Sequence, residues 1–440
     1  MKRTLAILIS MLAMLLFAST LVHYYPQATD HAPQLTTTSH PVLWVTSDTH
    51  FIAPSLHDQH RAWQNIEGTA AGKDMDDQPV ALKAFVAAAL KARPTAVVIT
   101  GDVTFNGELS SAKSIARRLA PLTKAGIHLL VIPGNHDIYD GWARQYKGNR
   151  QLQTTQISPD DWRQIFHDGY ANETSEDADS LSYAVNLNHD YQLLMLDDNI
   201  YTVQPATIQP TTGGRLRSST LSWLRQQLVK AHRDGRQTLV FMHHNLYDHN
   251  QHAEGWTLEN AGALRKLLAD YRVPVVFSGH IHAQDITADP DGRYATKEIT
   301  SASFTETPGI YGVVDLTPHH LAYHTVAQDL TPVLSAAQKK TPLAHYQRHL
   351  KHLFIDDQAL PIVWQEAKDA GLQGADLRNA ATFLAELNWR FFSGNDSGSP
   401  AALQQMPGYR AVMGNAHLRR RAQALLQDKN LPDHQLNLNY

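Results

Sequence analysis

Five short fragments of this chain consist almost entirely of residues that can bind a metal ion or assist one. Each fragment follows an apolar run with the composition of a β-strand. In chain order they are Asp48-Thr49-His50, Gly101-Asp102, Gly134-Asn135-His136-Asp137, His243-His244 and Gly279-His280-Ile281-His282. Because neighbouring strands can end at one edge of a sheet, distant fragments can meet there. We interpret the five as one site for two metal ions.

The chemistry of these side chains indicates which ions the site would bind. Asp48 and His50 are two residues apart, so at the end of an extended strand both side chains point to one side and can reach one ion. The two histidines of the last fragment repeat this spacing. Asp102 can bridge two ions, and Asn135 offers a neutral carbonyl oxygen. Oxygen and imidazole ligands together favour Mn, Fe or Zn over Ca, which prefers a cage of oxygen atoms.

No single fragment is strong evidence, because Asp-x-His and Gly-Asp are common in ordinary turns. Gly-Asn-His-Asp after the apolar run 131–133 is much more specific. All five fragments in this order, each at the end of a strand, favour a metal site over a chance pattern.

The segments between the fragments alternate between strand-like and helix-like patterns. Helical stripes at 82–90, at 115–122 and around 260–270 separate apolar runs. These runs lie at 42–45, 96–99, 127–132, 183–185, 193–196, 239–242 and 273–277. Residues 311–314 and 321–323 predict a closing hairpin. The alternation predicts an α/β (α+β) layered domain over 41–329 whose sheet strands are buried on both faces.

The two ends of the chain differ from this domain. Residues 25–40 are polar and contain prolines, which indicates a linker. Beyond about residue 330 apolar residues recur at helical spacing and strand-like runs are missing. We therefore predict a helical C-terminal domain over 330–440.

The N-terminus predicts export. Lys2 and Arg3 precede an apolar run over 5–22 that has no polar face. Residues 1–24 are therefore a signal peptide or an N-terminal membrane anchor. The run is long enough to stay in a membrane, and a clear cleavage motif is missing, so both alternatives remain open. In either case the protein would be extracellular or tethered to the outer face of the cytoplasmic membrane.

Charge and cysteine content exclude several classes of function. The formal net charge is −4 (38 − 42), which provides no general attraction to nucleic acid, and none is expected as a partner. With 0 cysteines, disulfides and thiolate zinc sites are excluded. The sequence indicates no oligomeric state.

The set of fragments resembles the calcineurin-like metallophosphoesterase superfamily over 42–326, with no motif residue missing. The resemblance implies a β-sandwich flanked by helices, with two divalent metal ions at the strand ends. It implies that one ion is bound by Asp48, His50, Asp102 and His282, and the other by Asp102, Asn135, His243 and His280.

The resemblance also implies catalytic roles. His136 would be the general acid near the leaving group, and Asp137 would orient it. A hydroxide held between the ions would attack phosphorus. The residues alone leave the choice between His243 and His244 open; the family pattern favours His243, and His244 would then cap the site or touch phosphate.

Loop sequences at 51–58, 101–108 and 179–183, together with the helical C-terminal region, are similar to exported bacterial members that act as cyclic-nucleotide phosphodiesterases. This similarity predicts a small-molecule phosphoester, most simply a nucleotide, as substrate. Two alternatives remain: a phosphomonoesterase or nucleotidase of broad specificity, and a non-catalytic envelope protein that only binds a ligand.

Several other residues have side chains that could bind a substrate but also have simpler interpretations. Tyr139, Tyr247 and Trp256 could stack on a base, although ordinary packing of loops is the simpler expectation. The run of arginines at 419–421 could contact phosphate or membrane, although a solvated helix face is expected.

Overall fold

The computed structural model describes residues 33–249, 256–396, 400–426 and 431–440. The segment 1–24 lies outside these ranges, so its role as signal peptide or anchor stays a prediction, which fractionation of cells expressing the tagged protein would check. Within the described ranges, none of the helices combines the length and the apolar character that crossing a bilayer requires.

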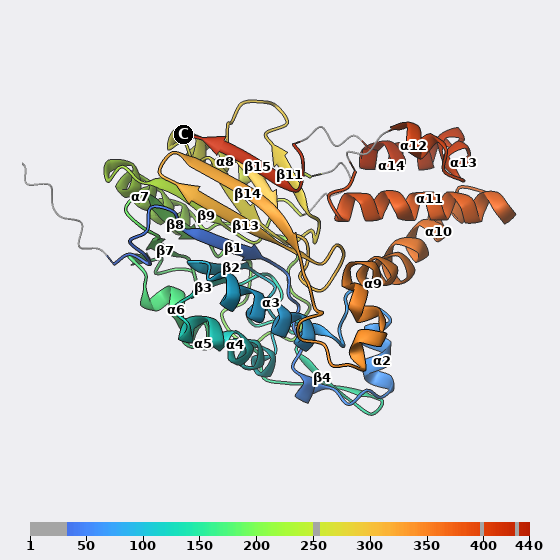
Figure 1. Ribbon diagram of the computed structural model, residues 1–440, viewed down its shortest axis with the longest axis horizontal. Coiled ribbons are helices and arrows are strands. Elements are labelled where there is room, and N and C mark those ends of the chain that lie inside the picture. Colours follow the sequence, from blue (N-terminus) through green and yellow to red (C-terminus); the bar gives the residue numbers. More distant parts are fainter. Residues whose placement is uncertain (1–32, 250–255, 397–399, 427–430) are drawn as a thin grey trace, which may run out of the picture. The chain divides into compact units, whose positions relative to one another are not determined.

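Two mixed β-sheets form the centre of the fold (Figure 1). The first has the order β15-β14-β13-β1-β2-β3, with β1, β2 and β3 parallel. The second has the order β11-β12-β10-β9-β8-β7-β6, with β8, β9, β10 and β12 parallel. The strands of the first sheet are β1 (Val42–Thr46), β2 (Ala96–Thr100), β3 (His128–Ile132), β13 (Ile310–Thr317), β14 (His320–Ala327) and β15 (Gln435–Asn439). Those of the second are β6 (Ser175–Glu176), β7 (Tyr183–Asn186), β8 (Tyr191–Met195), β9 (Gln237–Phe241), β10 (Val275–Ser278), β11 (Asp285–Ala288) and β12 (Lys297–Thr300).

The two sheets pack face to face through alternate apolar side chains. Val45, Val98 and Leu130 of the first sheet share one buried cluster with Phe241 and Phe277 of the second. The two phenylalanine rings stack with their centroids 4.9 Å apart. Each such side chain contributes about 1.5–3 kcal/mol of burial, so this layer holds the strand ends in fixed positions. The structure thereby confirms the predicted β-sandwich.

Helices cover the outer faces of both sheets. On the first sheet these are α3 (Gln78–Ala92), α4 (Leu109–Lys124), α5 (Pro159–Ile165) and α6 (His167–Ala171); on the second they are α7 (Ser218–Arg233) and α8 (Ala261–Asp270). Smaller elements complete this part: the 3₁₀ turn η1 (Pro54–Leu56), α2 (Arg61–Glu67) and the hairpin β4 (Arg144–Lys147) with β5 (Arg150–Gln153). Strands covered by helices on one face and by the other sheet on the opposite face are buried on both sides and read as continuous apolar runs, which is why the sequence revealed them.

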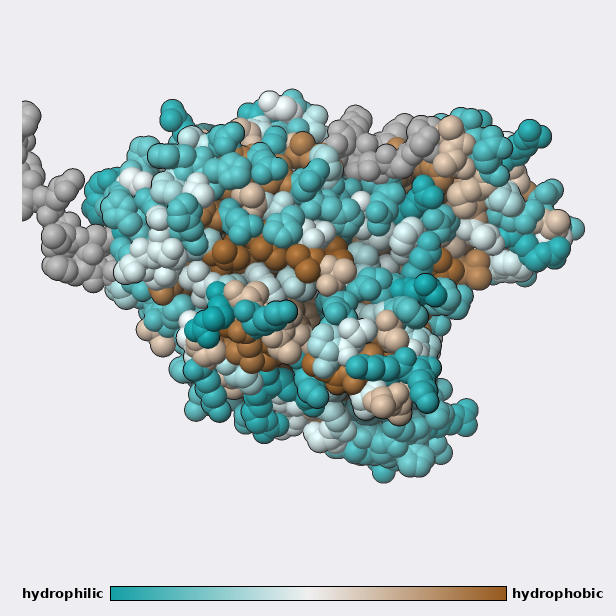
Figure 2. Space-filling model, viewed as in Figure 1, coloured by the Kyte–Doolittle hydropathy of each residue, from teal (hydrophilic) through white to brown (hydrophobic). Residues whose placement is uncertain are grey.

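The C-terminal region is helical, as predicted, and its apolar side chains form a cluster that also includes Ile281 and Ala283. Its elements are η2 (Gln338–Lys340), η3 (Pro342–His345), α9 (Tyr346–Leu353), the π-helix η4 (Phe354–Ala359), α10 (Leu360–Asp369), α11 (Gly374–Phe392), α12 (Pro400–Gln404), α13 (Tyr409–Gly414) and α14 (Ala416–Leu426). On the face shown in Figure 2, apolar side chains appear in patches separated by hydrophilic ones.

Two boundaries differ from the sequence analysis. The C-terminal region is not purely helical, because β15 pairs antiparallel with β14 and returns the chain to the first sheet. The polar residues of β15 alternate with Leu436 and Leu438, a pattern too short to identify alone. The predicted linker also contributes to the sheets, because Leu35 donates a backbone hydrogen bond to Asn186 (3.0 Å).

Candidate metal centre

The five fragments meet because of the strand order. Asp48 and His50 follow β1, and Asp102 follows its parallel neighbour β2. His243 follows β9, and His280 follows the parallel neighbour β10 in the other sheet. Parallel neighbours end at the same edge, and the packed sheets bring both edges together.

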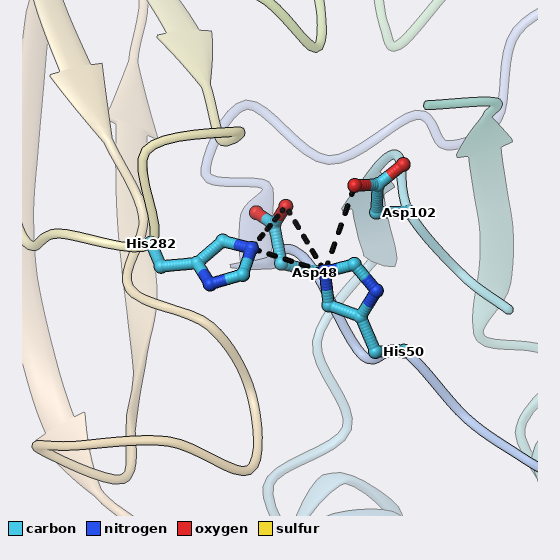
Figure 3. Close-up of side chains that lie close together, drawn as sticks. All are labelled: Asp48, His50, Asp102 and His282. Atoms are coloured by element: carbon cyan, nitrogen blue, oxygen red, sulfur yellow. Dashed lines mark hydrogen bonds and ion pairs between the residues drawn. The ribbon is translucent and has the colours of Figure 1, made fainter. Parts of the chain in front are cut away.

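A first group of ligand atoms contains Asp48, His50, Asp102 and His282 (Figure 3). The Nε2 atoms of His50 and His282 are 3.0 Å apart. His50 Nε2 lies 3.6 Å from Asp102 Oδ2, and His282 Nε2 lies 3.4 Å from Asp48 Oδ1. Four donor atoms within 4.8 Å of one another match the size of a metal coordination shell.

A second group shares Asp102 with the first and adds His243 and His280. His243 Nε2 lies 3.5 Å from Asp102 Oδ2 and 3.1 Å from Asn135 Oδ1. The structure thus brings all seven predicted ligand residues together, in two groups joined by one carboxylate. This arrangement corresponds to a site for two metal ions.

The donor set fits such ions. His280 Nε2 is buried without a hydrogen-bond partner among the described residues, and a buried polar atom rarely stays unsatisfied unless something else binds it. Burial, with His244 and His243 nearby, holds the pKa of His280 well below its usual value, so the ring stays neutral and can bind a metal. Burial opposes ionisation of Asp102, but His243, His136 and His50 outweigh it and hold its pKa well below its usual range.

The two histidines of the last fragment do not reach the same ion, contrary to what their spacing predicts. His280 and His282 are two residues apart but belong to different groups. Both have left-handed backbone conformations, with φ of 72° and 59°, and so do not follow the alternation of an extended strand. Asp48, His50 and Asp102 share this conformation, at φ of 50°, 38° and 44°. Such residues cost about 1–3 kcal/mol each and are typical of functional sites.

The structure distinguishes the two neighbouring histidines after β9. His244 Nδ1 contacts Asp198 Oδ1 (3.2 Å), and its Nε2 contacts the Thr212 carbonyl oxygen (3.0 Å). Both ring nitrogens are therefore engaged away from the ligand groups, whereas His243 Nε2 faces them. Asp198 also accepts hydrogen bonds from the backbone N–H groups of both histidines and so fixes this turn. Asp198 was missed, although its position just after β8 obeys the same rule of polar residues at strand ends.

His136 lies at the edge of the centre, but Asp137 does not orient its ring. The Asp137 carboxylate accepts hydrogen bonds from the backbone of Val103, Thr104 and Gly134, and so joins two loops. The neighbours of His136 Nδ1 are instead Asn106 Oδ1 (3.1 Å) and Asp140 Oδ2 (3.3 Å). The expected orienting role of Asp137 is therefore wrong, because its carboxylate oxygens accept hydrogen bonds from these backbone N–H groups and not from the His136 ring.

Charged residues behind the ligands form a second layer. Glu306 Oε2 lies 3.0 Å from His282 Nδ1 and 3.8 Å from Lys73 Nζ. A carboxylate behind a ligand histidine fixes its ring and raises its basicity. Burial and Lys73 lower the pKa of His282, but Asp48 and Glu306 outweigh them and raise it to about 9. The surroundings of His282 therefore attract positive charge strongly.

A cavity of about 680 Å³ opens onto both ligand groups. Its walls include His136 and Asn106 on one side, and Lys73 and Arg144 among the cationic side chains. This volume is within the range of about 300–1,000 Å³ found for small-molecule sites. A substrate can therefore reach the metal ligands and His136 together.

These features define the class of protein: a two-layer α/β sandwich with a two-metal site at its strand ends, which is the arrangement of a metallophosphoesterase. Comparison with protein families agrees, since residues 41–284 match the calcineurin-like phosphoesterases. The chain belongs to this family and is a phosphoric ester hydrolase. Residues 329–431 match the C-terminal domain of cyclic nucleotide phosphodiesterase.

Solved structures resemble the chain only distantly. A dimetal phosphatase from Danio rerio has 13% identity over 66% of this chain and 96% of its own, with a TM-score of 0.48. Purple acid phosphatase PPD1 from yellow lupin (Lupinus luteus) seeds has 11% identity over 67% of this chain and 52% of its own, with a TM-score of 0.41. The comparison with curated proteins gave no match.

Proposed function

We propose that this protein hydrolyses cyclic-nucleotide phosphodiesters in a reaction that depends on two divalent metal ions, either Mn, Fe or Zn. The observation that carries the proposal is the pair of ligand groups that share Asp102 and open, with His136, onto one cavity. The match of 329–431 to the C-terminal domain of cyclic nucleotide phosphodiesterase supports the choice of substrate.

In this proposal the ligands are the seven residues predicted from the sequence: Asp48, His50, Asp102, Asn135, His243, His280 and His282. Two ions bound there would supply Lewis-acid activation of the phosphate and of the attacking water. Imidazole and carboxylate ligands suit Mn, Fe and Zn alike, so the proposal keeps all three.

Side chains of the protein itself would transfer the proton and balance charge on the substrate. His136 Nδ1 is engaged by Asn106 and Asp140, so Nε2 is the nitrogen that can face the cavity. Burial lowers the pKa of His136, but Asp102 and Asp140 outweigh this effect and raise it. A protonated ring held in this way can give its Nε2 proton to the leaving alkoxide. Lys73, 11% exposed on the cavity wall, can balance charge on the substrate phosphate.

A metal-reconstitution assay tests the proposal. The purified protein is stripped with a chelator, reloaded with Mn, Fe or Zn, and assayed on cyclic AMP, AMP and bis(4-nitrophenyl) phosphate, with products separated by chromatography. We expect activity only after reloading, and conversion of cyclic AMP to AMP without further release of phosphate. Release of phosphate from AMP at a comparable rate would identify a phosphomonoesterase instead. Inactivity on every ester with every metal would support a ligand-binding protein.

A further inference from the structure

A second cavity, of about 250 Å³, adjoins the metal centre. His280 and His282 form one wall of it, and the same histidines border the larger cavity. Trp256 also borders both cavities, so the two are neighbours that share three side chains. Residues of η4 and of the C-terminal helices α11 and α14 supply the rest of its lining.

The walls of this smaller cavity are mainly aromatic and aliphatic. Trp256 is 37% exposed, and its ring centroid lies 5.0 Å from that of His280. Ile281, together with Phe391 and Phe392 of α11, also lines this cavity. A large aromatic side chain left partly open to solvent next to an apolar wall is a natural place for a flat ligand group to stack.

A few fixed polar groups complete the cavity. Asn388 is only 7% exposed; its Oδ1 accepts a hydrogen bond from Arg421 (3.3 Å), while its NH₂ makes no hydrogen bond within the described part of the chain. Arg421 is fixed in turn by Glu366 Oε1 (2.7 Å). A buried amide with unused donors at the edge of an apolar pocket is suited to the polar edge of a planar heterocycle. The arginine run 419–421 was expected on a solvated helix face, but the Arg421 side chain is only partly exposed and pairs with Glu366.

The helical region also reaches the ligands themselves. The Gln358 amide, oriented so that its nitrogen donates, bonds Glu306 Oε1 (2.9 Å) and the Ala71 carbonyl (2.8 Å). Glu306 is the carboxylate behind His282. Gln358 lies in the π-helix η4, and single π turns inside helices are frequent at functional sites. The C-terminal helices are thus built against the metal centre.

We propose that this smaller cavity is the base subsite: the nucleobase of the substrate stacks against Trp256, with its polar edge at Asn388, while the phosphate lies at the metal centre. The inference rests on the proposed function. The cavity is smaller than whole small-molecule sites, which suits one moiety of a substrate whose remainder lies in the larger cavity. The helical C-terminal domain would then select the substrate.

Another exposed tryptophan offers the base an alternative position. Trp142 lines the larger cavity, is 45% exposed, and has its ring centroid 6.5 Å from that of His136. The larger cavity also has aromatic and amide side chains, but the amides of Asn106 and Asn135 contact His136 and His243. We therefore favour the smaller cavity, and the experiment includes Trp142 as the rival.

The test compares two substrates that differ only in the base: adenosine 3′,5′-cyclic phosphate and the 1-deoxyribose cyclic phosphate that lacks adenine. The variants are Trp256→Ala, Asn388→Leu and Trp142→Ala, with Trp364→Ala as the control for loss of an exposed tryptophan that borders neither cavity. We divide kcat/KM for cyclic AMP by kcat/KM for the analogue that lacks adenine. If the base stacks on one aromatic side chain, Trp256→Ala should lower this ratio by roughly 5- to 100-fold. Asn388→Leu should lower it as well, and Trp364→Ala should not.

Two results would overturn the base subsite. One is an equal loss on both substrates in Trp256→Ala and Asn388→Leu. The other is a fall in the ratio for Trp142→Ala alone, which would place the base in the larger cavity.

A separate experiment distinguishes failure of this inference from failure of the proposed function: inhibition by adenosine of the hydrolysis of bis(4-nitrophenyl) phosphate. If the wild type hydrolyses that ester but not cyclic AMP, the function fails, while adenosine inhibition weakened by Trp256→Ala would still support the subsite.

Discussion

Two carboxylates close to His136 in the sequence, Asp137 and Asp140, have different roles in the structure. Asp137 follows His136 directly in the sequence, yet its oxygens hold the backbone of Thr104 and Gly134. Asp140, four residues after His136, reaches the ring because the loop turns back at Tyr139, where φ is 49°. Asp140 is therefore a positioning residue for the proposed acid, and Asp137 is a structural residue of the loop.

We expect His136→Ala to reduce kcat on an alkyl phosphodiester by roughly 10²–10⁴-fold, the usual contribution of a general acid. The loss should be much smaller on bis(4-nitrophenyl) phosphate, because nitrophenolate leaves without a proton. Asp140→Asn should show the same dependence on the leaving group with a smaller loss, and Asp137→Asn should instead lower the melting temperature. Steady-state kinetics on both esters check this, and equal losses on both for His136→Ala would contradict its role as acid.

At the scale of elements, the loops after parallel strands approach one another so closely that glycine is required. A Cβ atom on Gly279, after β10, would collide with Ser47 Oγ and with Asp48 Oδ2 in the loop after β1. A Cβ atom on Gly134 would likewise collide with the backbone nitrogen of Asp102. The glycines of the fragments thus let ligands of the two sheets lie within one coordination distance.

We expect Gly279→Ala to reduce bound metal strongly while the sandwich still folds, because the added methyl pushes apart only the loops that carry the ligands. Metal analysis of the purified variant, with circular dichroism to verify folding, checks this expectation. The control is Gly262→Ala in α8, where a Cβ atom meets nothing within 4 Å. Full metal occupancy in Gly279→Ala would show that the loops tolerate a wider separation.

For the whole molecule, folding stability should depend on a carboxyl group outside the metal centre. Glu108 is fully buried just before α4, and burial raises its pKa from 4.5 to about 8, despite the opposing effect of Ser111. The folded state therefore holds a proton that the unfolded state releases near pH 4.5. The contribution of Glu108 is fully present below that pH and is lost as the pH rises towards about 8.

Glutamine does not ionise, so we expect Glu108→Gln to remove this pH-dependent loss of stability. The unfolding free energy of the variant minus that of the wild type should therefore increase with pH, by up to about 1.4 kcal/mol per pH unit. Urea unfolding between pH 5 and pH 8 with chelator present keeps metal binding out of the comparison. Glu259→Gln, at an exposed carboxyl group, is the control. A difference that does not change with pH would show that Glu108 is ionised in the folded state.

The sequence by itself predicted most of the longer strands, several helices and the residues that meet at the candidate metal centre, but not β4, β5, β6, β11, β12 or β15. Apolar runs and helical stripes are local patterns, and metal-binding residue types at strand ends remain recognisable without a structure. Only the tertiary structure showed that the His244 ring contacts Asp198 and Thr212, and that Asp140 contacts the ring of His136. It also returned the C-terminus to the first sheet and placed Asn388 beside the metal ligands. These outcomes depend on loop conformation and on contacts between residues far apart in the sequence, from 32 positions for His244 and Thr212 to more than a hundred for β14 and β15. Local periodicity carries no information about either.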